Sequence, residues 1–251
     1  MGTKALGQHI LLNNILHQDL RLITRRGSDL GDSVNQVLIF PSEYIEIQRH
    51  YPIFIQQTEA GGFKSVALLG FDKDENLFLE GDQWTVPYIP AMQRISPFLI
   101  GQPTPPPGEN LPADAEAMIL VDPDHVRIST KEGEPLFLAH GGHSPTLVHV
   151  TQTIHQVFVG SKLSDPMFSA FLEAGLLAPV QIDVKLDDQK SYMLNDMFTI
   201  SREGLQRLEA DQLKSLNQMG FLALAFYIAS SLSNLSHMIT LKNKRSAGSG
   251  S

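Results

Sequence analysis

The sequence predicts an α+β protein whose N-terminal half is mostly antiparallel β and packs with a helical C-terminal half. Up to about residue 100 the apolar runs are short and bounded by turn residues, which is typical of strands. Beyond Ser144 the apolar residues recur with the period of a helix. The predicted organisation is a single domain at residues 1–245, with a β-rich part (1–100), a proline-rich connection (101–115), a mixed and then helical part (116–245), and an added linker (246–251).

The first strands are predicted at the apolar runs VLIF (37–40) and YPIFI (51–55). Two further runs, KSVALLGF (64–71) and LFLE (77–80), flank the polar residues 72–76. Polar residues rich in Asp and Asn between two apolar runs are typical of a hairpin turn. We therefore expect the runs at 64–71 and 77–80 to pair.

The segment at residues 87–97 carries three prolines, which exclude a long regular element but permit a helical turn at residues 91–95. Farther along, the apolar runs at 116–121 and 125–130 flank the residues Asp-Pro-Asp at 122–124. Asp and Pro favour a turn there, so these two runs are predicted to form a second strand pair.

Ser144 and Pro145 predict the start of a helix, because serine caps helix N-termini and proline fits the first helical position. Its apolar residues fall on one face at about 100° per residue. A second helix is predicted to begin at Asp165-Pro166 and to end at Gly175. The predicted buried face of the first helix consists of Leu147, Val150, Ile154, Val157 and Phe158.

The last part of the chain predicts a strand, a turn and a strand within residues 178–200. Ser201 is then expected to open a short helix, and one long apolar helix is expected from about Asp211 to Leu235. Residues 215–241 contain no Asp, Glu, Lys or Arg and are long enough to span a bilayer. Their serines and asparagines favour a buried helix, so we expect no integral membrane segment.

Composition limits the function classes. The chain has 251 residues and a net charge of -8, which gives no electrostatic basis for binding nucleic acid. It contains no cysteine, so disulfides, thiolate chemistry and Cys-ligated metal centres are excluded. The N-terminus shows no secretion signal pattern, which predicts a cytoplasmic protein.

Histidines suggest two weak metal sites. His17 and Asp19 form an H-x-D motif, and on a strand both side chains would project from one face, as in iron oxygenases. His140 and His143 flank a Gly-Gly pair, but two imidazoles need further ligands to hold a metal tightly. The other histidines of this stretch, at positions 149 and 155, lie about 240° apart on the predicted helix, so they do not complete the site. We therefore expect no bound metal.

Other signatures fail on inspection. Residues 72–76 imitate the start of a calcium loop, but Leu77 and Gln83 stand where Gly and Glu are needed. The common hydrolase, phosphate-binding and dinucleotide-binding motifs are absent from the sequence. We therefore expect no catalytic residue and no cofactor.

The candidate binding residues are aromatic and basic. Trp84, Tyr88 and Arg94 lie in the proline-punctuated segment, where two aromatic rings and a cation can line a peptide or ligand groove. His50 and Tyr51, before a proline, have the same character. The alternative is that these side chains pack the core of the sheet.

Several stretches carry a resemblance to a known family. They are HYPI (50–53), the segment from LLG to NLF (68–78), and Trp84 followed by YIP (88–90). In order and spacing the chain resembles the bacterial SapC family over nearly its whole length. The resemblance implies an accessory role linked to surface-layer or outer-membrane receptor systems and to oxygenase or halogenase partners.

The sequence thus leaves two functions open. The first is a non-catalytic accessory protein that binds a protein or peptide partner. The alternative is a metal-dependent oxygenase of the non-haem iron type that uses His17 and Asp19.

Overall fold

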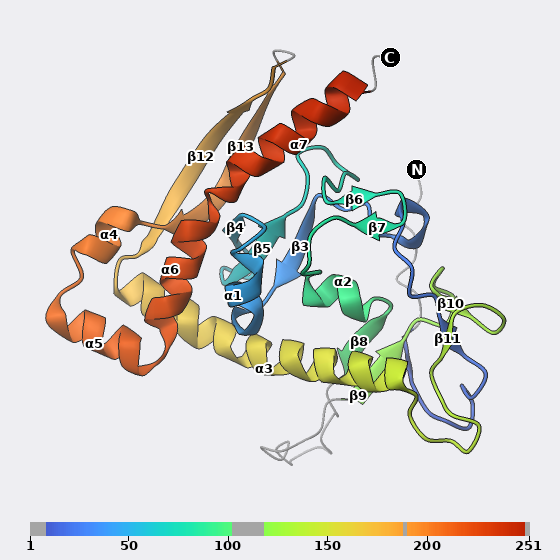
Figure 1. Ribbon diagram of the computed structural model, residues 1–251. Coiled ribbons are helices and arrows are strands. Elements are labelled where there is room, and N and C mark those ends of the chain that lie inside the picture. Colours follow the sequence, from blue (N-terminus) through green and yellow to red (C-terminus); the bar gives the residue numbers. More distant parts are fainter. Residues whose placement is uncertain (1–8, 102–117, 188–189, 249–251) are drawn as a thin grey trace.

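The computed structural model describes residues 9–101, 118–187 and 190–248, and it has the predicted α+β organisation (Figure 1). The helices are η1 (Ser28–Leu30), η2 (Pro41–Glu43), α1 (Tyr44–Ile47), α2 (Ala91–Ile95), α3 (Pro145–Glu173), α4 (Arg202–Gln206), α5 (Ala210–Gln218), α6 (Phe221–Ser231) and α7 (Asn234–Gly248). The predicted connection at residues 101–115 lies outside the described residues from position 102 on.

The largest sheet has the strand order β12-β13-β4-β5-β3, and its pairings are antiparallel. The strands β3 (Gln36–Ile39), β4 (Ile53–Gln57) and β5 (Phe63–Leu68) form its N-terminal part. The long hairpin of β12 (Leu177–Lys185) and β13 (Ser191–Ile200) confirms the strand, turn and strand predicted there. Figure 1 shows this hairpin rising away from the rest of the sheet.

Three smaller sheets lie around the first. Their strand orders are β1-β9-β8, β10-β2-β11 and β6-β7. They consist of β1 (Ile10–Leu11), β2 (Arg21–Leu22), β6 (Leu79–Glu80), β7 (Gln83–Trp84), β8 (Phe98–Gly101), β9 (Met118–Val121), β10 (Ile128–Ser129) and β11 (Glu134–Pro135).

Both predicted strand pairings around polar turns are wrong. β5 pairs with β3 and β4, and the run at 77–80 contributes β6, which pairs with β7. Likewise β9 pairs with β1 and β8, while β10 pairs with β2. In each case the chain does turn at the polar residues, but β5 pairs with β4 before it, β6 with β7 after it, and β9 with β8 before it.

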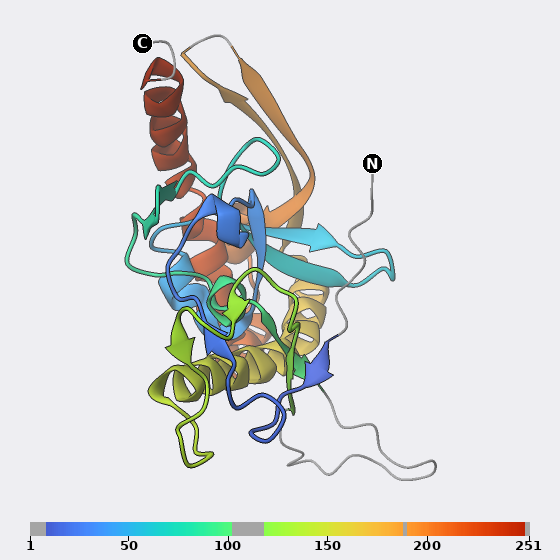
Figure 2. The same cartoon turned by 90° about the vertical axis from the view of Figure 1, so that its right-hand side faces the viewer.

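Helix α3 connects two hydrophobic cores. Its first half places Leu147, Val150 and Ile154 in a core with α2, β8 and β9. Its second half places Phe168 and Phe171 in the core of the five-stranded sheet and α6. At 1.5 Å per residue the helix is about 44 Å long. Both views show it running along the base of the molecule, and α7 and the β12–β13 hairpin rise on the opposite side (Figures 1 and 2).

Two predicted helix boundaries are wrong. The helix predicted to begin at Asp165-Pro166 is the second half of α3, which passes through Pro166 without a break. Burial of the same face on both sides of Pro166 offsets its missing backbone donor. The single helix predicted at 211–235 is instead divided into α5, α6 and α7. Gly220 ends α5 in the left-handed conformation, with a φ of 77°.

Helix α7 continues to Gly248 and so includes the first residues of the linker predicted at 246–251, whose remaining residues lie outside the described ranges. By length and composition alone, residues Phe221–Gly248 are apolar enough to cross a membrane. In the structure α6 contributes Phe221, Ala225 and Ile228 to the core of the five-stranded sheet.

Candidate binding site

A buried carboxylate organises the predicted binding residues. Glu43, at the end of η2, is 1% exposed, and its Oε2 accepts hydrogen bonds from the Tyr88 hydroxyl at 3.0 Å and the Ala91 amide at 2.8 Å. Its Oε1 accepts the Phe40 amide at 3.3 Å. Burial raises the pKa of Glu43 in spite of these bonds. This side chain fixes the start of α2 and the position of the Tyr88 ring.

Tyr51 holds the next layer of this network. Its hydroxyl donates to the Tyr88 carbonyl at 2.5 Å and accepts from Trp84 Nε1 at 2.7 Å. The Tyr51 ring is buried and meets the Phe78 ring edge-on at 4.7 Å between centroids. Burial raises the pKa of Tyr51 and of Tyr88, so both hydroxyls stay protonated at neutral pH. His50 lies beside the Tyr51 ring at 6.1 Å.

Arg94 carries the network from α2 toward α3. Its Nη2 donates to the Tyr88 hydroxyl and to Gln156 Oε1, both at 3.2 Å, and its guanidinium lies 5.1 Å from the centre of the Tyr88 ring. Its Nε is buried and has no hydrogen-bond partner within the described parts of the chain. Within the same parts of the chain, Arg94 forms no ion pair. The structure therefore brings Tyr51, Trp84, Tyr88 and Arg94 together.

Beside Arg94 the surface is hollowed into a pocket of about 490 Å³. It lies between the chain that follows β2, the α2 segment and the first turns of α3. We call it the arginine pocket because Arg26, Arg94 and Arg127 all line it. Its other lining residues are Leu22, Ile23, Thr24, Ile89, Ser96, Pro145, Thr146, His149 and Val150.

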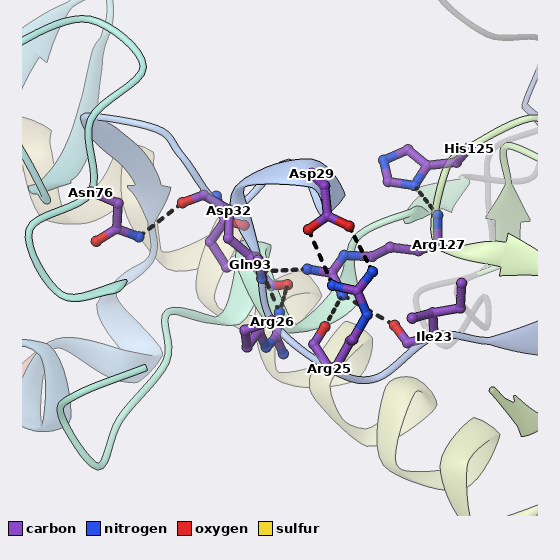
Figure 3. A network of polar contacts seen from close by, with 10 residues as sticks. Ile23, Arg25, Arg26, Asp29, Asp32, Asn76, Gln93, His125 and Arg127 are labelled. Carbon is purple, nitrogen blue, oxygen red and sulfur yellow. Dashed lines mark hydrogen bonds and ion pairs between the residues drawn. The ribbon is translucent and has the colours of Figure 1, made fainter. Parts of the chain in front are cut away.

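Asp32 anchors two of the three arginines (Figure 3). Its Oδ2 accepts Arg127 Nη2 at 2.5 Å and the Gly27 amide at 2.9 Å. Arg26 Nη1 lies 3.5 Å from Asp32 Oδ1 and donates to the Gln93 carbonyl at 3.0 Å. Arg127 Nη1 donates to the carbonyls of Ile23 and Arg25 at 3.1 and 2.8 Å. Two guanidinium groups are thus fixed at the pocket wall by backbone and carboxylate contacts.

The pocket is electrostatically positive. Burial lowers the pKa of Arg26, and the neighbouring charges of Arg127 and Arg94 add to this effect while Asp32 opposes it. The first turn of α3 also lines the pocket, with Ser144 capping it through a hydrogen bond of 3.2 Å from the Leu147 amide. A helix N-terminus carries partial positive charge.

The predicted metal candidates do not assemble into a site. His17 and Asp19 lie in a turn, not on the strand that the H-x-D reading assumed. His17 is buried, and its Nδ1 accepts the Asn13 amide at 3.0 Å, while Asp19 is exposed. His140 and His143 are exposed on their loop. Throughout the described ranges, no three His, Asp or Glu side chains gather in a metal-binding group.

The calcium-like loop has a structural partner. Lys242 of α7 contacts Asp72 Oδ2 at 2.5 Å and Glu75 Oε1 at 2.6 Å. Arg245 donates to the carbonyls of Asn76 and Leu79 at 2.9 and 2.6 Å. The acidic residues of this loop therefore attach α7 to the rest of the protein.

A second pocket, of about 350 Å³, lies between α4 and α6 and contains none of the predicted residues. It is lined by Leu205, Phe226 and Ala229 together with Arg202, Gln206 and Ser230. Arg202 donates to the Ala229 carbonyl at 3.3 Å, so its charge already has a backbone partner.

Sequence reasoning missed Glu43, Asp32, Arg26 and Arg127. The run RRGSDLGD at residues 25–32 does hold a signal, because two arginines, two aspartates and two glycines fall within eight residues. Arg127 gave no such signal, since it lies 95 positions from Asp32 in sequence.

The comparisons with known proteins give one positive result. A scan against protein-family models matches the SapC family over residues 12–238. No curated protein and no solved structure matches the chain. Because the family model covers nearly the whole sequence, the chain belongs to the SapC family.

Proposed function

We propose that this SapC-family protein is a non-catalytic accessory protein that binds a protein or peptide partner at the arginine pocket. The observation that carries the proposal is Arg94, whose guanidinium is half-buried at the pocket wall without an ion pair in the described part of the structure. A charge held in this way is available to a bound group.

The chemistry of the wall supports binding over catalysis. Guanidinium groups hold their charge and do not exchange protons near neutral pH, so Arg26, Arg94 and Arg127 attract and orient an anion without acting as acid or base. Leu22, Ile89 and other apolar side chains supply the rest of the wall. A concave surface with apolar walls and a few fixed polar groups is typical of binding sites.

The resemblance to the family indicates which partners and which location to propose. The proposed partners belong to surface-layer or outer-membrane receptor systems or are oxygenases or halogenases, and the proposed location is the cytoplasm. Sedimentation with liposomes tests the location, because residues Phe221–Gly248 are apolar enough to reach a membrane. We expect the protein to stay in the supernatant, and co-sedimentation would show membrane attachment and contradict a protein that is free in the cytoplasm.

Site-specific crosslinking in the native host tests the proposed contact. Thr24 lines the pocket and is exposed, so a photoreactive amino acid with a small aliphatic diazirine side chain at this position reaches a bound partner without filling the pocket. Lys185, whose side chain is 80% exposed on β12, is the matched control position. We expect one protein or peptide to crosslink from position 24 and not from position 185. Identical products from both positions, or none from position 24, would overturn the proposal.

A further inference from the structure

The arginine pocket has more positive than negative charge around it. Arg26, Arg94 and Arg127 line it, and the carboxylates nearest to them are Asp32 and, behind the Tyr88 hydroxyl, Glu43. Three guanidinium groups against two carboxylates leave at least one positive charge uncompensated. This excess stands out in a chain with a net charge of -8.

Two donors at this wall are unused. Arg127 is 2% exposed, and its Nε has no hydrogen-bond partner within the described residues. Arg94 Nε is also buried and has no hydrogen-bond partner within the described residues. A buried donor without a partner is costly, so native structures usually supply one. Both arginines line the same pocket, and because the two Nε atoms have no exposed surface, a ligand there pairs with them only when a side chain turns toward it.

The start of α3 adds a third attraction for an anion. Pro145 and Thr146 of its first turn line the pocket, and α3 is 29 residues long. Pro145 has no amide hydrogen and the Leu147 amide already donates to Ser144 Oγ, so the helix N-terminus contributes its dipole, which favours negative charge. The helix end therefore acts on the same volume as the guanidinium groups.

The remaining wall limits what carries the charge. Leu22, Ile23, Ile89, Pro145 and Val150 present apolar surface to the pocket. A volume of about 490 Å³ is in the range of small-molecule sites. A small inorganic anion would leave this apolar surface uncovered.

We propose that the arginine pocket binds a single carboxylate carried by an apolar body. The inference rests on the proposed function only in taking that body to be the C-terminal residue of a peptide. A free aliphatic acid offers the same chemistry. Arginine forks bind carboxylates through paired hydrogen bonds, and the apolar wall covers the attached side chain or tail.

Calorimetric titration of the purified full chain tests the inference. The probes are acetyl-Ala-Ala-Leu with a free C-terminal carboxylate, the same peptide as its C-terminal amide, octanoate, and inorganic phosphate. We expect the peptide acid or octanoate to bind at least about tenfold more tightly than both the amide and phosphate, since a hydrogen bond to a charged group is typically worth about 1.5–3 kcal/mol. Tighter binding of the peptide acid assigns the carboxylate to a peptide, and tighter binding of octanoate assigns it to a free acid.

Variants assign the binding to this pocket. Arg94→Gln should weaken the best probe at least about tenfold, whereas Arg94→Lys should weaken it less. Arg25→Gln is the matched control, because Arg25 pairs with Asp29 on the surface and does not line the pocket. Thr24→Trp should also weaken binding, since it fills the mouth of the pocket without removing a charge. A thermal unfolding curve for each variant verifies that it is folded.

The inference is overturned if no carboxylate binds, if amide and acid bind equally, if phosphate binds more tightly, or if Arg25→Gln weakens binding as much as Arg94→Gln. Its failure is distinguishable from failure of the proposed function. A partner that crosslinks from position 24 while no carboxylate binds removes the inference alone. Carboxylate binding without any crosslinked partner removes the proposed function alone.

Discussion

Arg127 donates a hydrogen bond of 2.5 Å from Nη2 to Asp32 Oδ2, and the two side chains are 2% and 1% exposed. Burial removes water from both charges, so each depends on the other for compensation. The pair joins the loop after β2 to the chain before β10 and holds Arg127 against the pocket. The order of the arginine pocket therefore depends on one buried carboxylate.

Asp32→Asn should lower the free energy of unfolding by about 3–5 kcal/mol, because it leaves Arg127 and Arg26 buried with their compensating charge removed. Urea denaturation measures the change. Asp29→Asn is the control, since Asp29 pairs with Arg25 on the surface and should matter little. Equal effects of the two substitutions would show that the buried Asp32–Arg127 pair stabilises the protein no more than the exposed Asp29–Arg25 pair does.

Lys242→Met should lower the free energy of unfolding by about 1–2 kcal/mol, because Lys242 attaches α7 to Asp72 and Glu75. The control is Lys185→Met, whose lysine lies beside Asp183 and is 80% exposed. Urea denaturation at neutral pH should separate the two variants. A loss as small for Lys242→Met as for the control would contradict this assignment.

The same ion pair predicts a pH dependence. The hydrogen bond from Lys242 lowers the pKa of Asp72 below its ordinary value. The stabilisation is therefore complete above the ordinary aspartate pKa of about 3.9 and is lost as pH falls through the lowered folded-state pKa. Denaturation curves below about pH 4 should fall less steeply for Lys242→Met than for the wild type. Parallel curves would contradict the role of this pair.

Glu43→Ala should lower the free energy of unfolding by at least about 1–3 kcal/mol, because it leaves the Ala91 amide and the Tyr88 hydroxyl without their acceptor. Glu46→Ala is the control, since Glu46 pairs with Arg49 on the surface. Chemical denaturation of both variants measures the difference. A smaller loss for Glu43→Ala than for Glu46→Ala would remove Glu43 from the centre of the network.

Burial of Glu43 also has a pH signature of the opposite sign to that of Asp72. Because burial raises the pKa of Glu43, its contribution to the free energy of unfolding is most favourable below the unfolded-state pKa and declines as pH rises through the folded-state pKa. In the wild type, the free energy of unfolding should decline for this reason as pH rises from about 4. The Glu43→Ala variant should lack this decline. A decline of equal size in the variant would assign it to another group.

Gly160→Ala should destabilise the protein, although this change in a helix ordinarily stabilises by about 1 kcal/mol. An added Cβ would lie 2.3 Å from Ser42 Oγ and 2.7 Å from Phe40 Cβ, so α3 and η2 must separate. We expect a loss of about 1–3 kcal/mol in thermal or urea unfolding. Val159→Ala, at an exposed neighbouring position, should change little. An increase in stability for Gly160→Ala would show that α3 does not approach η2 this closely.

Local chemistry predicted much of the fold. The Ser144 cap with Pro145, the turn at residues 91–95 and the hairpin within 178–200 appear as expected. Each depends on residues close in sequence, where capping groups, prolines and alternating apolar residues act directly. Trp84 and Tyr88 pack against the core of the five-stranded sheet, as the alternative predicted, and of the predicted binding residues Arg94 lines the pocket.

Contacts between distant residues account for what the sequence did not predict. Strand β5 pairs with β4, which precedes it by a short turn, and with the more distant β3, instead of with the run that follows it. Asp32 and Arg127 are 95 positions apart, and Asp72 and Lys242 are 170 apart. Charges at such separations carry no sequence pattern of their own, so the arginine pocket emerges only when the chain is folded.

The yield of crosslinked partner from position 24 in two variants tests the central claim most directly. Arg94→Gln alters the pocket wall, and Arg25→Gln alters a neighbouring surface ion pair. If the pocket is the contact, Arg94→Gln lowers the yield at least about tenfold, and Arg25→Gln leaves it at the wild-type level. Equal yields in the two variants would contradict the assignment of the binding function to the arginine pocket.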